Sequence, residues 1–163
     1  MKEKILPLTL SLLIISIAGC SLIPGTQPTP TPLPSIPPSG YEPQPGDADL
    51  KRDQVFMDVG NSRVVIRESL PAQVSLILNG SLSDPCHQLR IVVTPPDANN
   101  VINLDAYSVV NPAVACITVL KPFAATIPLG SYSDGDYTVM VNGERLGLFG
   151  VGSGIAPAVQ VTP

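Results

Sequence analysis

The residues of this 163-residue chain whose type and spacing best suit thiol or metal chemistry are its cysteines and its histidine. Cys20, Cys86 and Cys116 are accompanied by a single histidine, His87, which directly follows the second cysteine. An imidazole beside a thiol can activate it as a nucleophile, but we expect instead a surface histidine next to a structural disulfide. Two cysteines and one histidine without a C-x-x-C spacing fall short of the four ligands of a zinc site. We therefore expect neither a metal nor a cofactor.

Other catalytic patterns are also missing from the sequence. A Ser-His-Asp arrangement has only His87 to draw on, and no serine lies in a G-x-S-x-G elbow. The glycine-rich residues 147–152 lack the lysine of a phosphate-binding loop. Asp134 and Asp136 offer oxygen ligands for calcium, but the distal glutamate of an EF-hand loop is absent, and both also suit a simple turn. We expect a protein that is not an enzyme.

The first twenty residues have the composition of an export signal. Lys2 and Lys4 precede an apolar run over residues 5–17 that is too short to span a bilayer. Residues 17–20, with the sequence IAGC, resemble the lipobox of bacterial lipoproteins. The resemblance implies a signal peptide at residues 1–19 and a lipid on Cys20, which would anchor the chain stably in a membrane of the bacterial cell envelope, outside the cytoplasm. The alternative is a secretory signal followed by a chance cysteine.

Lipidation of Cys20 leaves Cys86 and Cys116 as an even pair in an exported protein. Disulfides form and persist in oxidising compartments, so these two cysteines are expected to bond to each other. The bond would close a loop of about thirty residues, which is worth about 3–4 kcal/mol on the chain-entropy account.

Residues 20–46 hold most of the prolines and indicate a spacer. Proline fixes φ and lacks an N–H donor, so we expect a disordered linker that samples polyproline II at about 3 Å per residue. A PxxP ligand for a recognition domain is an alternative use of this composition, and glycosylation of Thr26, Thr29 or Thr31 is another. The formal net charge of −4 leaves no basic footprint for nucleic acid.

Residues 47–152 alternate short apolar runs with turn residues and show no helical periodicity of any length. Asn142-Gly143 is a strong hairpin signal. The pattern predicts an all-β, antiparallel immunoglobulin-like β-sandwich of about seven strands, followed by a flexible tail over residues 153–163. The apolar runs that supply candidate strands cover residues 55–59, 63–68, 73–78, 89–93, 101–109, 113–120, 123–129, 137–141 and 146–151.

Residues 133–137, with the sequence SDGDY, resemble the tyrosine corner of immunoglobulin-like folds. The resemblance implies that the Tyr137 hydroxyl bonds back to an upstream backbone group. Ser133 replaces the usual leading aspartate, and no cysteine follows Tyr137 by two residues, so the chain departs from antibody domains here.

The succession PCHQL, ACITVLKPF and IPLGSYSDGDYTVMVNG resembles a family of uncharacterised bacterial lipoproteins with paired cysteines. The resemblance covers residues 69–149. It implies a fold and a location, and it implies no activity.

These features predict a membrane-anchored, surface-exposed lipoprotein that acts as a non-catalytic binding module for an envelope or extracellular protein or a glycan. Its contact surface is expected on the loops at one end of the sandwich, because loops held by a rigid scaffold commonly carry binding residues. The residues concerned are Asp97, Asn99, Asn100, Tyr132, Asp134 and Asp136. The alternative is an exported protease inhibitor of immunoglobulin-like fold. Asn111-Pro112 and Lys121-Pro122-Phe123 weakly resemble two loops of chagasin-type inhibitors.

Overall fold

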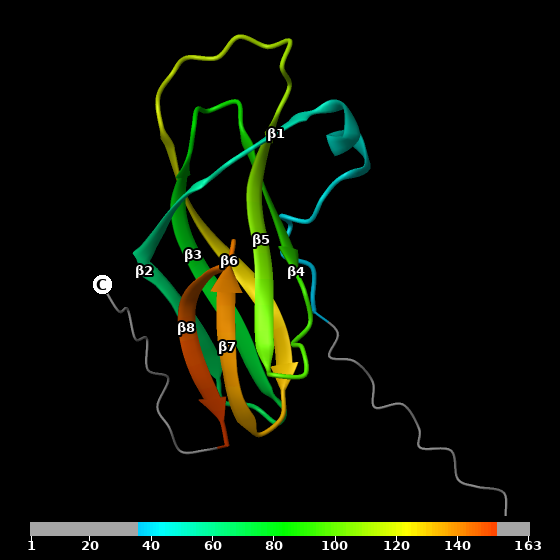
Figure 1. The fold of residues 1–163 in the computed structure, drawn as a ribbon, viewed down its shortest axis with the longest axis vertical. Coiled ribbons are helices and arrows are strands. Elements are labelled where there is room, and N and C mark those ends of the chain that lie inside the picture. Colours follow the sequence, from blue (N-terminus) through cyan, green and yellow to red (C-terminus); the bar gives the residue numbers. More distant parts are fainter. Residues whose placement is uncertain (1–35, 153–163) are drawn as a thin grey trace, which may run out of the picture. The chain divides into compact units, whose positions relative to one another are not determined.

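The structure of the protein, a computed structural model, describes residues 36–152, which form a two-layer β-sandwich (Figure 1). No helix in this range is long and apolar enough to cross a membrane. The expected signal peptide, Cys20 and the tail over residues 153–163 lie outside the described residues. The elements in order are the 3₁₀ turn η1 (Pro45–Asp49), β1 (Lys51–Asp53), β2 (Phe56–Arg67), β3 (Ala72–Leu82), β4 (Gln88–Val93), β5 (Val101–Val110), β6 (Lys121–Tyr132), β7 (Gly135–Val141) and β8 (Glu144–Val151).

The strands divide into a three-stranded and a five-stranded sheet. The first has the order β2-β3-β6, with antiparallel neighbours. In the second, β5 pairs with β4, β1 and β7, and β8 follows β7. The predicted all-β sandwich is thereby confirmed, with eight strands where about seven were expected.

One pair departs from the expected antiparallel arrangement, because β5 and β7 run parallel. Their register joins Val101 to Thr138 and Leu104 to Val141. Immunoglobulin-like domains are built from two antiparallel sheets, so this pair sets the five-stranded sheet apart from them. A period-two pattern fixes which side of a strand is buried and carries no information about the direction of its neighbour.

The core lies between the sheets and follows the alternation expected for strands with one buried face. On β3, Val74, Leu76 and Leu78 are at most 1% exposed while the residues between them are only partly buried. The facing sheet contributes Ile102, Leu104, Val139 and Val141. Burial of each such side chain contributes about 1.5–3 kcal/mol before the cost of ordering the chain.

Three of the expected strand segments differ from the structure. The segments at residues 55–59 and 63–68 form one strand, β2, whose register shifts by a bulge between Asp58 and Arg63. Ser62 occupies this bulge, where its hydroxyl donates to Asp58 O and accepts from Asn79 N. Residues 113–120 form no strand and belong instead to an exposed connection between β5 and β6.

The last part of the proline-rich segment packs against the sandwich. Tyr41 O accepts a 2.7 Å hydrogen bond from Ile91 N on the outer edge of β4, and Pro37, Pro38 and Pro43 lie near Ile91. Residues 36–44 therefore cover an otherwise open strand edge, and we call them the strap. Unpaired edges invite pairing with other chains, and covering them is a common protection.

Candidate functional site

The loop at residues 97–100 lies beside the turn at residues 133–134 and the start of β7, at one end of the sandwich. Asn100 O accepts a 3.0 Å hydrogen bond from Thr138 N, which ties the first loop to the start of β7. Asp97 Oδ1 closes the first loop by accepting from Asn99 N (2.8 Å) and Val101 N (2.9 Å). We call this loop, the turn and the start of β7 the polar end.

Five of the six predicted contact residues are exposed at the polar end: Asp97, Asn99, Asn100, Asp134 and Asp136. Tyr132 is a correction, because it is 3% exposed and belongs to the core. Its hydroxyl donates to Leu129 O at 2.7 Å, and burial raises the pKa of Tyr132 to about 12. Tyr132 therefore supports the loops from below and offers no surface to a partner.

Tyr137 makes the contact implied by the tyrosine-corner resemblance. Its hydroxyl donates to Ser133 O at 3.2 Å. The ring stacks on Phe149 with centroids 5.1 Å apart and lies 4.8 Å from the ring of Tyr132. These aromatic contacts join β6, β7 and β8 beneath the polar end and hold the second loop in place.

The carboxylates of the polar end do not converge on one point. A Cβ placed on Gly152 would fall 2.3 Å from Asp134 Cγ, so this carboxylate lies against the end of β8. Within residues 36–152, the only three potential metal-ligating groups that gather within 4.8 Å of one another are Asp84, Cys86 and Cys116, at the opposite end. The geometry of the polar end suits recognition by separate hydrogen bonds and charges.

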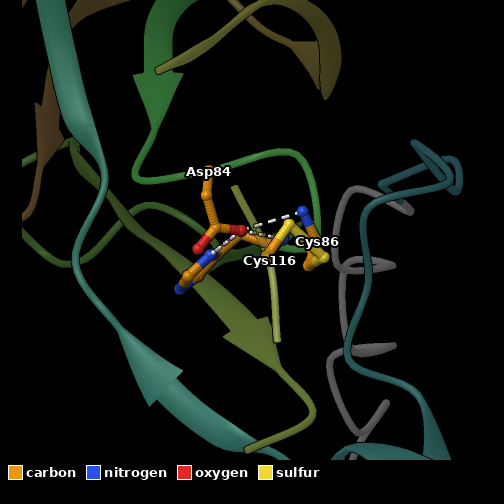
Figure 2. The surroundings of a disulfide bond; sticks show 4 residues. Asp84, Cys86 and Cys116 are labelled. Atoms are coloured by element: carbon orange, nitrogen blue, oxygen red, sulfur yellow. Dashed lines mark hydrogen bonds and ion pairs between the residues drawn. A yellow bond between two sulfur atoms is a disulfide. The ribbon is translucent and has the colours of Figure 1, made fainter. Parts of the chain in front are cut away.

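The opposite end is built around the disulfide expected from the sequence. Cys86 and Cys116 are bonded, with Cα atoms 6.1 Å apart (Figure 2). Asp84 Oδ1 accepts from Cys86 N at 2.8 Å and lies 2.8 Å from His87 Nδ1. The contact with the His87 ring and the hydrogen bonds from the backbone N–H groups of Cys86 and His87 lower the pKa of Asp84 below its ordinary value, while burial acts in the opposite direction.

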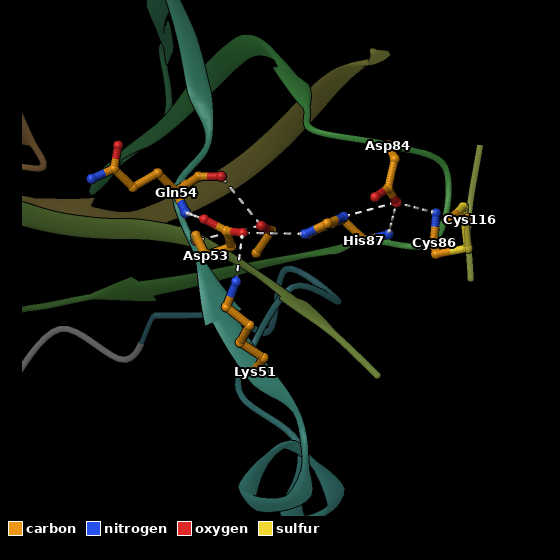
Figure 3. A network of polar contacts seen from close by, with 8 residues as sticks. Lys51, Asp53, Gln54, Asp84, Cys86, His87 and Cys116 are labelled. Carbon is orange, nitrogen blue, oxygen red and sulfur yellow. Dashed lines mark hydrogen bonds and ion pairs between the residues drawn. A yellow bond between two sulfur atoms is a disulfide. The ribbon is translucent and has the colours of Figure 1, made fainter. Parts of the chain in front are cut away.

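His87 is buried, which corrects the expectation of a surface histidine. Its side chain is 6% exposed and lies between Asp84 and Asp53, whose Oδ2 is 3.7 Å from Nε2 (Figure 3). Neither ring nitrogen makes a well-aligned hydrogen bond within the described residues, although each lies within 3.7 Å of a carboxylate oxygen. Lys51 Nζ lies 3.6 Å from the same Asp53 oxygen.

This cluster has no nucleophile to activate. Both sulfurs are bonded to each other, so neither is available as a thiolate or as a metal ligand. The arrangement instead joins β1, through Asp53, to the connection that carries Cys86 and His87. The role of the cluster is therefore structural, because it holds these two segments together.

Residues 111–120 form the connection between β5 and β6, where the sequence predicted a strand over residues 113–120 and not an exposed loop. The available signal was Pro112, because proline has no N–H to donate to a neighbouring strand of a sheet. We call these residues the apolar loop because its four largest aliphatic side chains are more than half exposed: Val114 at 53%, Ile117 at 71%, Val119 at 51% and Leu120 at 59%. The disulfide holds the middle of this loop.

The segment resembling an inhibitor loop does not form a loop. Lys121, Pro122 and Phe123 begin β6, where they pair with Leu82, Ser81 and Gly80 of β3. Phe123 packs against the core.

Comparison with known proteins finds similarity at the level of the sandwich. An uncharacterised 10.2 kDa protein in the HgiCIIM 5′ region of Herpetosiphon aurantiacus is 29% identical over 87 residues, which cover 53% of this chain and 92% of that protein. No solved structure matches the chain significantly. Residues 76–151, from β3 to the end of β8, match the family described as the ORF11 beta-sandwich domain.

Proposed function

We propose that the protein is a bacterial lipoprotein, anchored by a lipid on Cys20, whose β-sandwich acts outside the cytoplasm as a non-catalytic binding module. The observation that carries the proposal is the Cys86–Cys116 disulfide, because such bonds persist in oxidising compartments. It agrees with the export signal indicated by the first twenty residues.

The polar end supports the binding role. Its exposed side chains are three aspartates and two asparagines, held on loops that the Tyr132, Tyr137 and Phe149 rings support from below. Polar side chains on rigidly supported loops are a common form of recognition surface. The partner in this proposal is an envelope or extracellular protein or a glycan.

A non-catalytic role is supported by the placement of the only histidine. His87 is buried between two carboxylates beside a closed disulfide. General acid–base work needs a group within reach of a substrate proton. In this proposal, His87 has a structural role and stabilises the fold.

Palmitate labelling of the full chain in a bacterial host tests the anchor. We expect label in the parent chain and none in Cys20→Ser. The double substitution Cys86→Ser with Cys116→Ser is the matched control and keeps its label, since the proposal places the lipid on Cys20 alone. Label in Cys20→Ser would refute the anchor.

Crosslinking tests the binding role. The lipidated chain is crosslinked in its own envelope, and the captured proteins and glycans are compared with those of a variant carrying Asp97→Ala, Asn99→Ala, Asp134→Ala and Asp136→Ala. The proposal expects loss of a partner in the variant. A set of partners unchanged by all four substitutions would overturn the choice of the polar end.

A further inference from the structure

The apolar loop calls for an explanation because it exposes large aliphatic side chains on a rigid support. Residues 106–120 contain no charged side chain, and the four most exposed aliphatic residues of this stretch all lie in the apolar loop. Contiguous exposed apolar surface marks a site of contact with a partner or a membrane. We propose that the apolar loop inserts shallowly into the lipid bilayer; this inference rests on the lipid anchor of the proposed function.

The loop is ordered before any contact is made. Cys116, at its centre, is bonded to Cys86, which lies between β3 and β4. Asn111 Oδ1 accepts from Ala113 N at 3.0 Å, and Val119 N donates to Ile117 O at 3.1 Å. Insertion of such a loop therefore loses little conformational freedom, which favours binding.

The side chains of the loop favour lipid over a protein partner. Protein interfaces concentrate their binding energy in Trp, Tyr and Arg, while Leu and Val are under-represented there. The apolar loop contains none of these three anchors and presents valine, isoleucine and leucine. Lys121, exposed directly after Leu120, has an aliphatic stem that can follow the loop and an ammonium that can remain at the phosphate level.

The charge of the protein predicts which membranes it would contact. The formal net charge is −4, so anionic lipid offers no attraction. Insertion then depends on apolar burial and proceeds on zwitterionic phosphatidylcholine. The loop reaches the boundary between headgroups and acyl chains, since irregular backbone is not tolerated deeper in the hydrocarbon.

The length of chain before the sandwich makes this contact possible. Fifteen residues lie between Cys20 and Ile36, and a fully extended chain of that length reaches about 50 Å. β5, whose ends carry the polar end and the apolar loop, has ten residues and spans about 33 Å. Either end of the sandwich could therefore reach the bilayer. We expect the end that carries the apolar loop to be the one that contacts it. The polar end is left pointing away from the membrane.

A single tryptophan tests the proposal, because the chain has none. Ile117→Trp is placed in the lipidated full chain, which is reconstituted into phosphatidylcholine vesicles with or without bromine on the upper acyl carbons. Interfacial elements lie about 5–10 Å into the boundary region, so we expect a blue-shifted emission and the loss of roughly half of it to bromine. Leu148→Trp, at a 42% exposed position on β8, is the matched control and keeps its emission.

Adding Val119→Asp to Ile117→Trp separates insertion from proximity. A buried carboxylate is costly in the interface, so quenching should fall to the level of the control while circular dichroism shows an unchanged sandwich. Equal emission from Ile117→Trp with and without bromine overturns the insertion. Equal quenching of Ile117→Trp and Leu148→Trp also overturns it, since the loop would then not be the contact. The palmitate labelling above decides independently whether the anchor exists, so the two proposals fail separately.

Discussion

At the scale of single residues, the absence of a side chain at one glycine permits two strands and an aromatic ring to pack closely. Gly80 lies under the ring of Phe123, its cross-strand partner in β6. A Cβ at this position would be 2.5 Å from Phe56 O and 2.7 Å from Phe123 Cζ. Because one of the obstructing atoms belongs to the backbone, the neighbours cannot simply rotate away.

We predict that Gly80→Ala destabilises the protein by about 1–3 kcal/mol, the usual range for overpacking. Denaturant unfolding measures the change. Gly60→Ala is the control, since the nearest atom to its Cβ would be Asp58 Oδ1 at 3.7 Å, and it should stay within about 0.5 kcal/mol of the parent. Equal stability of the two variants would contradict the packing argument.

The Arg90–Asp47 pair couples stability to pH. Asp47 accepts from Arg90 Nε at 2.7 Å and from a terminal guanidinium nitrogen at 2.8 Å. These contacts, led by the side-chain hydrogen bonds, hold the pKa of Asp47 below its ordinary value. A carboxyl with a lowered pKa stabilises the fold fully above its unfolded pKa, and this contribution is lost as the pH falls through the folded pKa.

We therefore predict that the free energy of unfolding falls on acidification below about pH 4, where aspartate ordinarily titrates. Asp47→Asn should be less stable than the parent at neutral pH and should lose less on acidification. Asp136→Asn, at an exposed position of the polar end, should follow the parent curve. The measurement is denaturant unfolding at a series of pH values, and parallel curves for Asp47→Asn and the parent would refute the coupling.

At the scale of elements, one side chain prolongs the parallel pairing of β5 and β7. Asn142 begins the hairpin turn after β7 and has a φ of 51°. Its side chain continues the contact between β7 and β5 beyond the last paired residues, Val141 and Leu104. Its Oδ1 accepts from Ala106 N and its Nδ2 donates to Ala106 O, both at 2.8 Å. The Asn-Gly turn and the pairing of β7 with β5 therefore depend on the same residue.

Asn142→Ala should cost about 1–3 kcal/mol, because two hydrogen bonds are lost and a non-glycine residue without a side-chain amide is held at positive φ. Hydrogen exchange at the Ala106 amide should accelerate in this variant. Asn99→Ala, at an exposed position of the polar end, is the control. Unchanged exchange at Ala106 would show that the side chain does not carry the pairing.

The sequence was informative about elements and less so about their neighbours. Alternation predicted most strands, Asn142-Gly143 predicted the hairpin, and the SDGDY segment predicted the Tyr137 contact, since each of these depends on residues close together in the chain. The parallel β5–β7 pair and the buried position of His87 depend on distant partners. His87 is enclosed in part by Asp53, thirty-four residues earlier, and no local pattern announces such a contact.

At the scale of the whole molecule, the disulfide joins the two connections that lie beyond the core at one end. It closes thirty residues that include β4 and β5. We predict that Cys86→Ala with Cys116→Ala lowers the free energy of unfolding by about 3–4 kcal/mol on the chain-entropy account. Cys20→Ser, which leaves this bond intact, should unfold at the parent midpoint. Identical midpoints for the double variant and the parent would show that the core alone sets stability.

The strap gives the domain a mechanical property. A pull on the chain before Ile36 enters the fold through residues 36–44, which are held to β4 by the Tyr41–Ile91 hydrogen bond and then by Asp47 on Arg90. These few contacts should yield before the ladders of the sheets, and their release frees the fifteen residues 36–50, or about 50 Å of extended chain. Under a sudden load the released residues would then lengthen the chain before the sandwich, while the sandwich and its loops keep their shape.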